Sequence, residues 1–223
     1  LRNVKAHQLG SIVIKEILKK NKIDSYEIDE VIMGQVLTAG AGQNPARQAA
    51  ISAGIPISKP AHIINQVCGS GLRAVISGFQ SIKLGEIKTV ISGGQENMSL
   101  APHSILYRNE KKFSEDNLID TMINDGLIDA FNHYHMGVTA ENVAKKFNIS
   151  RKEQDEFAFN SQKKTELAIS NNKFDDELVK IISETNILDK DEHPRPSITY
   201  RDLAKLKTVF QKDGTVTPGN SSG

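Results

Sequence analysis

The strongest constraint on the fold is an alternation of apolar runs and helical segments between residues 30 and 94. Three apolar runs have the length and composition of buried strands, at residues 30–37, 61–67 and 89–92. Helical patterns separate them, at residues 45–53 and 70–84, and another covers residues 7–20. Strands that alternate with helices in this way are typical of a parallel sheet covered by helices. The sequence therefore predicts an α/β fold.

Local signals define where these helices begin and end. Asn44 and Pro45 form an N-cap followed by a proline in the first turn, and Gly54 marks the end of that helix. Gly85 closes the helix that spans residues 70–84. The sheet and its helices are thus predicted by independent features.

The pattern weakens after residue 94. From Gln95 to Gly137 no period is sustained apart from a helical patch at 118–124, and so long an irregular stretch is usually functional. Thr139 then reads as the N-cap of a helix that ends near Phe147. Ser150-Arg151-Lys152-Glu153 is a capping box that opens a helix to about Ser170. Residues 177–182 are a candidate strand.

Composition excludes several classes of partner. The 28 basic and 27 acidic residues nearly cancel and no basic run occurs, so we expect no nucleic-acid partner. No apolar stretch approaches the roughly 20 residues of a membrane span, so we expect no membrane partner. The single Cys cannot form an intrachain disulfide, which favours a reducing compartment. We expect a cytoplasmic location, with the mitochondrial matrix as the alternative.

Cys68 is the candidate nucleophile. It follows an apolar strand and precedes a helix, at the edge of the sheet where parallel α/β folds place their sites. A helix N-terminus stabilises a thiolate, and Gly69 and Gly71 allow a substrate to approach closely. The Cys68 N–H is a candidate donor to a developing oxyanion. The alternative is a buried structural Cys.

Other polar groups carry weaker signals. His133 and His135 would point apart on a helix, so we predict no metal site. A basic group that could bind a phosphate, or form a solvated basic face, consists of Arg195, Arg201, Lys205 and Lys207.

Four motifs, in this order, resemble those of thiolases. They are Asn65–Ala74 (NQVCGSGLRA), Gly93–Ser99 (GGQENMS), Tyr134–Ala144 (YHMGVTAENVA) and Asp213–Gly223 (DGTVTPGNSSG). The resemblance covers essentially the whole chain and implies the N-terminal half of the thiolase-like layered α/β/α fold, with an inserted substrate-binding loop region. It divides the chain into a core at residues 1–94, a loop and insertion region at 95–212, and the start of a linker at 213–223. It also places a first strand before Leu1.

The resemblance implies an acyltransferase, an acetyl-CoA C-acetyltransferase of the biosynthetic short-chain type. Cys68 would accept an acetyl group from a CoA thioester, and a second acetyl-CoA would attack it as a carbanion to give acetoacetyl-CoA. The reverse reaction is thiolysis. His135 and Met136 would shape a small acyl pocket. The positions expected to contact CoA are Leu127, Arg195, Phe210, Pro218, Ser221 and Ser222. Two of the chain's residues depart from the family: Pro218 replaces a small residue, and Asp202 stands where some members have Ser.

The resemblance also implies partners and a setting. Acetyl-CoA, acetoacetyl-CoA and CoA would be the substrates, with no permanently bound cofactor, in a homodimer or homotetramer of fatty acid metabolism. Thiolases carry a catalytic His, an Asn and a second Cys in their second half, and residues 1–223 do not contain these motifs. We therefore expect residues 1–223 alone to be inactive. The alternatives are a catalytically incomplete thiolase fragment that at most binds CoA, and a relative of the ketoacyl synthases.

Overall fold

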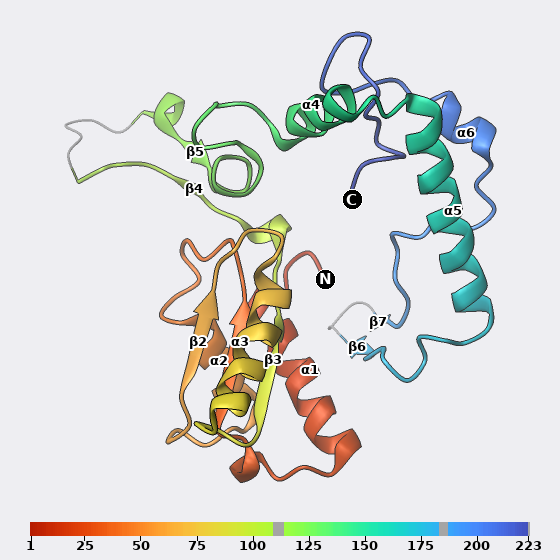
Figure 1. Cartoon of the computed structure of the whole chain (residues 1–223). Helices are drawn as coiled ribbons and strands as arrows, with labels where there is room; N and C mark the ends of the chain where they lie inside the picture. Colours follow the sequence, from red (N-terminus) through yellow and green to blue (C-terminus); the bar gives the residue numbers. More distant parts are fainter. Residues whose placement is uncertain (109–113, 183–186, 223) are drawn as a thin grey trace. The chain divides into compact units, whose positions relative to one another are not determined.

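The computed structural model describes residues 1–108, 114–182 and 187–222 (Figure 1). The chain forms two compact units, Leu1–Gly126 and Leu127–Gly223. The division predicted at residues 94 and 212 was based on the resemblance to thiolases and not on which residues pack together. It stays a prediction.

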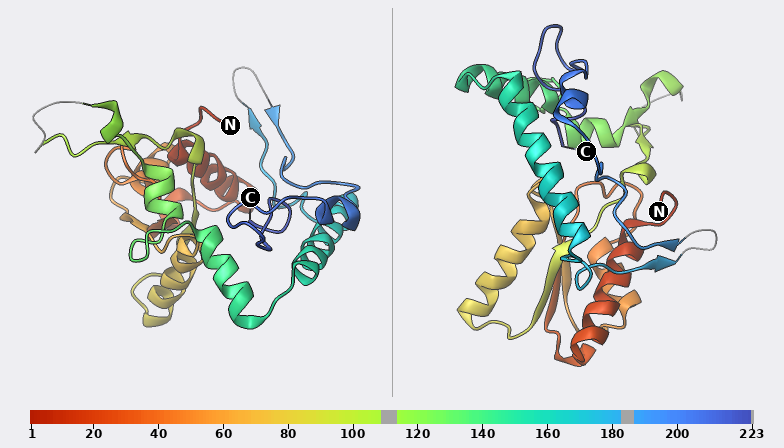
Figure 2. Two further views of the ribbon diagram at one scale, coloured as in Figure 1. Left: turned by 90° about the horizontal axis from the view of Figure 1, so that it is seen from above. Right: turned by 90° about the vertical axis from the view of Figure 1, so that its right-hand side faces the viewer.

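The first unit is built on a three-stranded parallel sheet with the strand order β2-β1-β3. The strands are β1 (Glu30–Gly34), β2 (Ala61–Ile64) and β3 (Val90–Gly94), and the helices are α1 (Ala6–Asn21), α2 (Pro45–Ala53) and α3 (Ser70–Leu84). Helix α3 covers one face of the sheet, whereas α2 and α1 lie on the other face (Figure 2). This arrangement confirms the predicted α/β layering.

The core of this unit lies between the sheet and α1 and α2. Val31 and Met33 of β1 are buried there with Ile14, Leu18 and Ile91. The predicted helix ends are confirmed: the Asn44 side chain accepts the Arg47 N–H at 3.1 Å, and Gly54 has a left-handed φ of 93°. Short-range capping therefore fixes α2 against a sheet that hydrophobic burial holds in place.

The second predicted strand is too long. It ends at Ile64 rather than Val67. The Asn65 side chain accepts the Val67 N–H at 3.0 Å, and Val67 adopts a left-handed φ of 47°, so the chain turns out of the extended conformation. A three-residue loop therefore separates the strand from Cys68.

Short elements complete the first unit. They are the 3-10 helices Ser25–Glu27, Met98–Leu100 and Glu115–Asn117, and the antiparallel strands β4 (His103–Ser104) and β5 (Ile119–Asp120). A π-helix at Ile123–Leu127 spans the boundary between the units, so its last residue belongs to the second. The helical patch predicted at 118–124 is thus partly wrong, because a strand occupies its first half.

The second unit contains three helices and a small hairpin within its described residues. They are α4 (Met136–Phe147), α5 (Arg151–Ser170), α6 (Tyr200–Ala204) and the antiparallel strands β6 (Ile181–Ile182) and β7 (Ile187–Leu188). Helix α5 begins at the predicted capping box, which Ser150 and Glu153 form. Helix α4 begins four residues earlier than predicted, because His135 rather than Thr139 is its N-cap. The strand predicted at 177–182 shortens to its last two residues.

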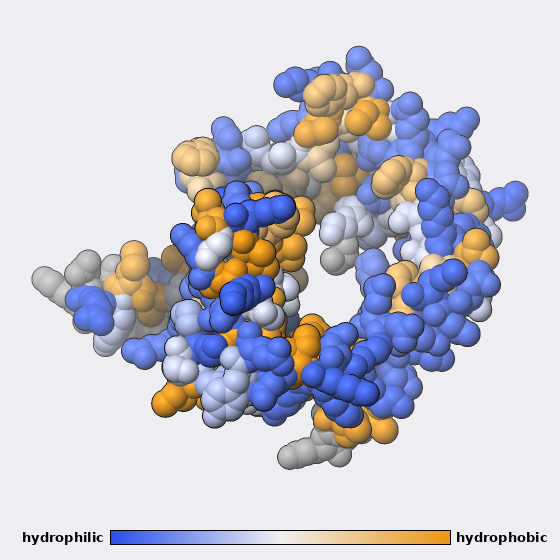
Figure 3. All heavy atoms as spheres, turned by 60° about the horizontal axis from the view of Figure 1, so that its bottom comes forward, coloured by the Kyte–Doolittle hydropathy of each residue, from blue (hydrophilic) through white to orange (hydrophobic). Residues whose placement is uncertain are grey.

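The surface of the molecule carries several apolar patches (Figure 3). A run of exposed apolar side chains lies along α3 and includes Leu72, Val75, Phe79 and Leu84. Across the described ranges, no helix has both the length and the apolar character needed to span a bilayer.

Candidate active site

Cys68 lies at the carboxyl end of the sheet and its side chain is exposed. It follows the loop after β2, and Gly69 is the N-cap of α3. Within the described residues the thiol is exposed rather than buried. The thiol is accessible to a substrate and sits at the positive end of a 15-residue helix dipole, as an acyl-accepting thiolate requires.

The loop that carries Cys68 is fixed by the Ser70 hydroxyl. Ser70 is 4% exposed, and its Oγ accepts the Gln66 N–H at 2.8 Å and donates to the Val67 carbonyl at 2.6 Å. The Gly69 N–H donates to the Gln66 carbonyl at 3.0 Å. None of these bonds uses the Cys68 N–H, which suits the predicted role as an oxyanion donor.

Val67 holds a strained backbone conformation directly before Cys68. Its φ of 47° lies in the left-handed region, which a β-branched side chain rarely adopts. Strain of this kind costs about 1–3 kcal/mol and persists only where the surroundings determine it. The hydrogen bonds of the Asn65 and Ser70 side chains hold the Val67 backbone in this conformation. The loop therefore presents Cys68 in one orientation.

Gly34 lets α3 approach the end of β1, whereas Gly94 of β3 and Gly71 of α3 lie at ordinary contact distance. A Cβ on Gly34 would lie 2.4 Å from the Ser70 carbonyl carbon and 2.5 Å from the Gly71 nitrogen. A Cβ on Gly94 would lie 3.5 Å from the Gly71 Cα. The N-terminus of α3 therefore rests on the backbone of β1 and β3, and this contact fixes the height of Cys68 above the sheet.

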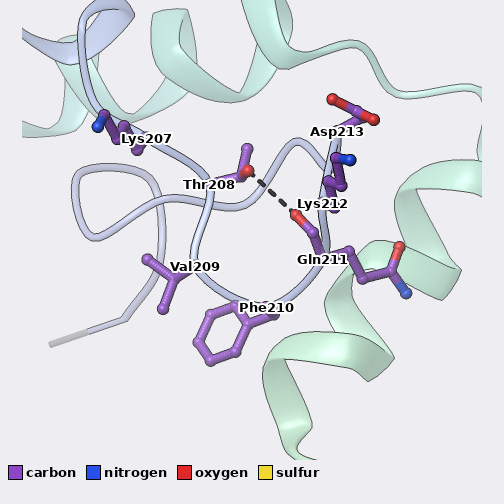
Figure 4. A pocket seen from close by; sticks show the side chains of 7 residues that line it. All are labelled: Lys207, Thr208, Val209, Phe210, Gln211, Lys212 and Asp213. Carbon is purple, nitrogen blue, oxygen red and sulfur yellow. Dashed lines mark hydrogen bonds between the residues drawn. The ribbon is translucent and has the colours of Figure 1, made fainter.

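The second unit brings two predicted substrate-contact residues together. The rings of His135 and Phe210 stack with centroids 4.8 Å apart and an interplanar angle of 19°. His135 Nδ1 accepts the Gly137 N–H at 2.9 Å, so the same ring also caps α4. Phe210 belongs to a loop at 207–213 that lines a shallow pocket, where Phe210 and Val209 project away from Asp213 (Figure 4).

The other residues predicted to contact CoA also lie in the second unit. Leu127 ends the π-helix and Met136 is 37% exposed. The Arg195 guanidinium donates to the carbonyls of Glu192 and His193 at 2.9 and 3.1 Å, so local contacts hold it. Pro218 and Ser222 are exposed, and the Ser221 N–H donates to Thr217 at 3.1 Å.

Asp202 has a structural role in the described fold. Its carboxylate accepts the Thr199 hydroxyl at 2.6 Å and the Thr199 N–H at 3.0 Å, which caps α6. These hydrogen bonds lower the pKa of Asp202, and the bond from the Thr199 hydroxyl has the larger effect. This departure from the family therefore serves the start of a helix. No group of three His, Cys, Asp or Glu side chains in the described ranges could hold a metal ion.

Two buried carboxylates were missed by the sequence analysis. Glu141 of α4 is 5% exposed and Asp155 of α5 is 1% exposed. Burial raises the pKa of Glu141, but hydrogen bonds from Val216 and Thr215 outweigh it, so the pKa lies below its usual value. Asp155 accepts from Arg151 Nε at 2.8 Å and from Asn220 at 2.9 Å. The signal available for Glu141 was an acidic residue one turn from the buried Gly137 and Ala144, whereas Asp155 had no such signal in the sequence.

The comparisons with known proteins agree with this geometry. The model of the thiolase N-terminal domain matches residues 1–223. An acetyl-CoA acetyltransferase of Rhizobium meliloti is 51% identical over 99% of this chain and 57% of its own length. One from Pseudomonas aeruginosa is 50% identical over 100% of this chain and 58% of its own.

A solved structure shows the same fold. The crystal structure of the Bacillus anthracis acetyl-CoA acetyltransferase superposes with a TM-score of 0.92 at 38% identity, over 100% of this chain and 58% of that one. The chain thus spans a little over half the length of these relatives. The match to a thiolase model over the full sequence also favours this family over the ketoacyl synthases. The chain therefore belongs to the thiolase family, whose N-terminal domain it matches from its first residue to its last.

Proposed function

We propose that this chain belongs to an acetyl-CoA C-acetyltransferase in which Cys68 carries the acetyl group. The observation that supports this most is the exposed Cys68 thiol, held by a strained and hydrogen-bonded loop at the N-terminus of α3. The relatives named acetyl-CoA acetyltransferase, which are 50–51% identical over 99–100% of this chain, support the same activity class.

The proposed reaction has two half-steps. The Cys68 thiolate attacks the thioester carbonyl of acetyl-CoA, the oxyanion accepts a hydrogen bond from the Cys68 N–H, and CoA leaves as a thiol after it gains a proton. The Cα carbanion of a second acetyl-CoA then attacks acetyl-Cys68, forms the new C–C bond and releases the Cys68 thiolate. The resemblance assigns the proton transfers to groups of the family's second half.

Transfer of acetyl to Cys68 tests this proposal directly. The protein as its own gene encodes it is incubated with acetyl-CoA, quenched in acid and digested for mass spectrometry. We expect an acetyl group on the peptide that contains Cys68. Acetylation that spares Cys68, or its complete absence, would refute the proposed nucleophile.

The substrates are proposed to be short acyl-CoA thioesters. By resemblance, His135 and Met136 shape a small acyl pocket, and the stack of His135 on Phe210 supports this role by holding the His135 ring in place. We expect kcat/KM for thiolysis of acetoacetyl-CoA to exceed that of a long 3-ketoacyl-CoA by about 100-fold, as expected when several methylenes cannot be buried. Equal turnover of both would contradict this specificity.

The protein is proposed to act as a homodimer or homotetramer, in the cytoplasm and in fatty acid metabolism, without a permanently bound cofactor. Strand β2, which leads to Cys68, is an edge strand of the sheet, and such edges are usually covered. The loop at roughly 100–125, which by resemblance joins dimers, includes residues 109–113, which lie outside the described ones. We expect light scattering on the protein at micromolar concentration to give a dimer or tetramer, whereas a stable monomer would overturn this prediction.

A further inference from the structure

Glu141 makes an unusually complete set of contacts for a residue outside the predicted site. Its Oε1 accepts the N–H groups of Thr215 at 2.8 Å and Val216 at 2.7 Å. Its Oε2 accepts the Thr215 hydroxyl at 2.9 Å. A Cβ on Gly214 would lie 2.3 Å from Oε1, so the loop backbone rests directly on the carboxylate. A buried charge that accepts several hydrogen bonds is a strong anchor.

This anchor lies beside the loop that carries Phe210. The Gly214 N–H donates to the Gln211 carbonyl at 3.2 Å and Thr208 Oγ1 donates to the same carbonyl at 3.0 Å (Figure 4). The Val209 N–H donates to the Val216 carbonyl at 3.2 Å. Residues 207–216 therefore form one hydrogen-bonded loop, and the Glu141 carboxylate holds its base.

Helix α4 contacts the loop at 207–216 at two places, near Phe210 and at Thr215 and Val216. Glu141 and Gly137 lie one turn apart on α4, directly after the N-cap His135. Gly137 is buried, and a Cβ there would lie 2.3 Å from the Phe210 ring. The first turns of α4 thus supply the stacking partner of Phe210, the space for its ring and the anchor of its loop.

We propose that Glu141 is the positioning residue of the loop at 207–216, which it fixes to α4 so that Phe210 stays stacked on His135 in contact with the CoA thioester. This inference rests on the proposed function, in which Phe210 contacts CoA. Phe210 offers an aromatic face, and Lys207 and Lys212 of the same loop offer positive charge for the phosphates. Glu141 itself does not touch the substrate in this arrangement.

The substitution Glu141→Gln tests the anchor with little change in volume. The Thr215 hydroxyl accepts from Gln154 Nε2 at 2.8 Å, so its own proton must point to Glu141. A Gln side chain replaces one carboxylate oxygen by an NH₂ group. Because the Thr215 N–H donates to Oε1 at 2.8 Å and to Oε2 at 2.9 Å, donors face donors in either orientation. We expect the loop to detach, and trypsin to cleave after Lys207 and Lys212 about tenfold faster, as loss of a charged hydrogen bond implies.

The kinetic readout separates positioning from a general loss of structure. We expect KM for CoA in thiolysis to rise about tenfold while kcat stays within about twofold, because the loop binds the ground state and the transition state alike. The variant Gly137→Ala, which displaces the Phe210 ring without touching the anchor, should raise KM in the same way. If Glu141→Gln fails to fold, Gly137→Ala and the milder Thr215→Val decide the question.

Asp29→Asn is the matched control. Asp29 also accepts two backbone N–H groups, from Lys88 at 2.8 Å and Thr89 at 3.1 Å, but it lies in the first unit at the opposite end of the strands from Cys68. It should leave KM and tryptic cleavage of the loop unchanged. Unchanged KM in folded Glu141→Gln and Gly137→Ala, or a fall in kcat alone, would overturn the inference. Failure of the proposed function would give a different result. The parent protein would then show no thiolysis, but Glu141→Gln would still speed tryptic cleavage of the loop.

Discussion

Replacement of Cys68 by Ala is expected to lower turnover of acetoacetyl-CoA and CoA by about 10⁴-fold or more, as loss of a covalent nucleophile does in other enzymes. Cys68 is the sole Cys among residues 1–223 and its thiol is exposed, so no other thiol of these residues can replace it. The measurement is the loss of the acetoacetyl-CoA absorbance on addition of CoA, with the native protein beside the variant.

The control for this prediction lies on the same helix. Ser81→Ala changes a half-buried side chain on α3 by one oxygen, and we expect it to retain the parent turnover. Acetyl transfer to the Cys68→Ala variant at the parent rate would show that another group carries the acyl intermediate. In that case the strained loop would have a purely structural role.

Local chemistry made much of the fold predictable. Asn44 with Pro45, and Ser150 with Glu153, are caps whose partners lie within three residues, and the structure forms both. The periodic segments at residues 7–20 and 70–84 are helices that pack buried apolar side chains, such as Ile14 and Ala74, against the sheet or the neighbouring helix. Such signals are complete within a short window of sequence, so no knowledge of the tertiary structure is needed.

The errors arose where side chains override the usual preferences. Apolar character continues to Val67, but the Asn65 side chain turns the backbone and ends the strand at Ile64. Helix α4 starts before Thr139 because His135 supplies an acceptor through its ring nitrogen, and His is not among the preferred N-cap residues. In both cases a single side-chain hydrogen bond outweighed the residue pattern.

The site itself depends on contacts between distant parts of the chain. Glu141 and Thr215 are 74 positions apart, and the stack of His135 on Phe210 joins residues that no local pattern connects. The sequence motifs identified the candidates by resemblance, but they could not show that a buried carboxylate anchors the loop. Cys68 was identifiable because its features, the glycines and the following helix, are adjacent to it in the sequence.

Gly34→Ala is expected to destabilise the first unit by about 3 kcal/mol or more, the upper part of the range for overpacking a close contact. The added Cβ would lie 2.4 Å from the Ser70 carbonyl carbon, 2.5 Å from the Gly71 nitrogen and 2.7 Å from the Ser70 oxygen. These are backbone atoms, which cannot rotate away as a side-chain end can. Relief requires that the N-terminus of α3 move off β1, and this movement carries Cys68 with it.

Gly93→Ala provides a control in the adjacent strand. Gly93 pairs with Met33, next to the pair of Gly34 with Gly94, and a Cβ there would meet no atom within 4 Å. Urea unfolding should show a lower midpoint for Gly34→Ala and an unchanged one for Gly93→Ala. Because α3 and Cys68 shift together, acetylation of Cys68 by acetyl-CoA should also slow in folded Gly34→Ala. Equal unfolding midpoints and equal acetylation rates for the two variants would mean that the seating of α3 on Gly34 does not position the thiol.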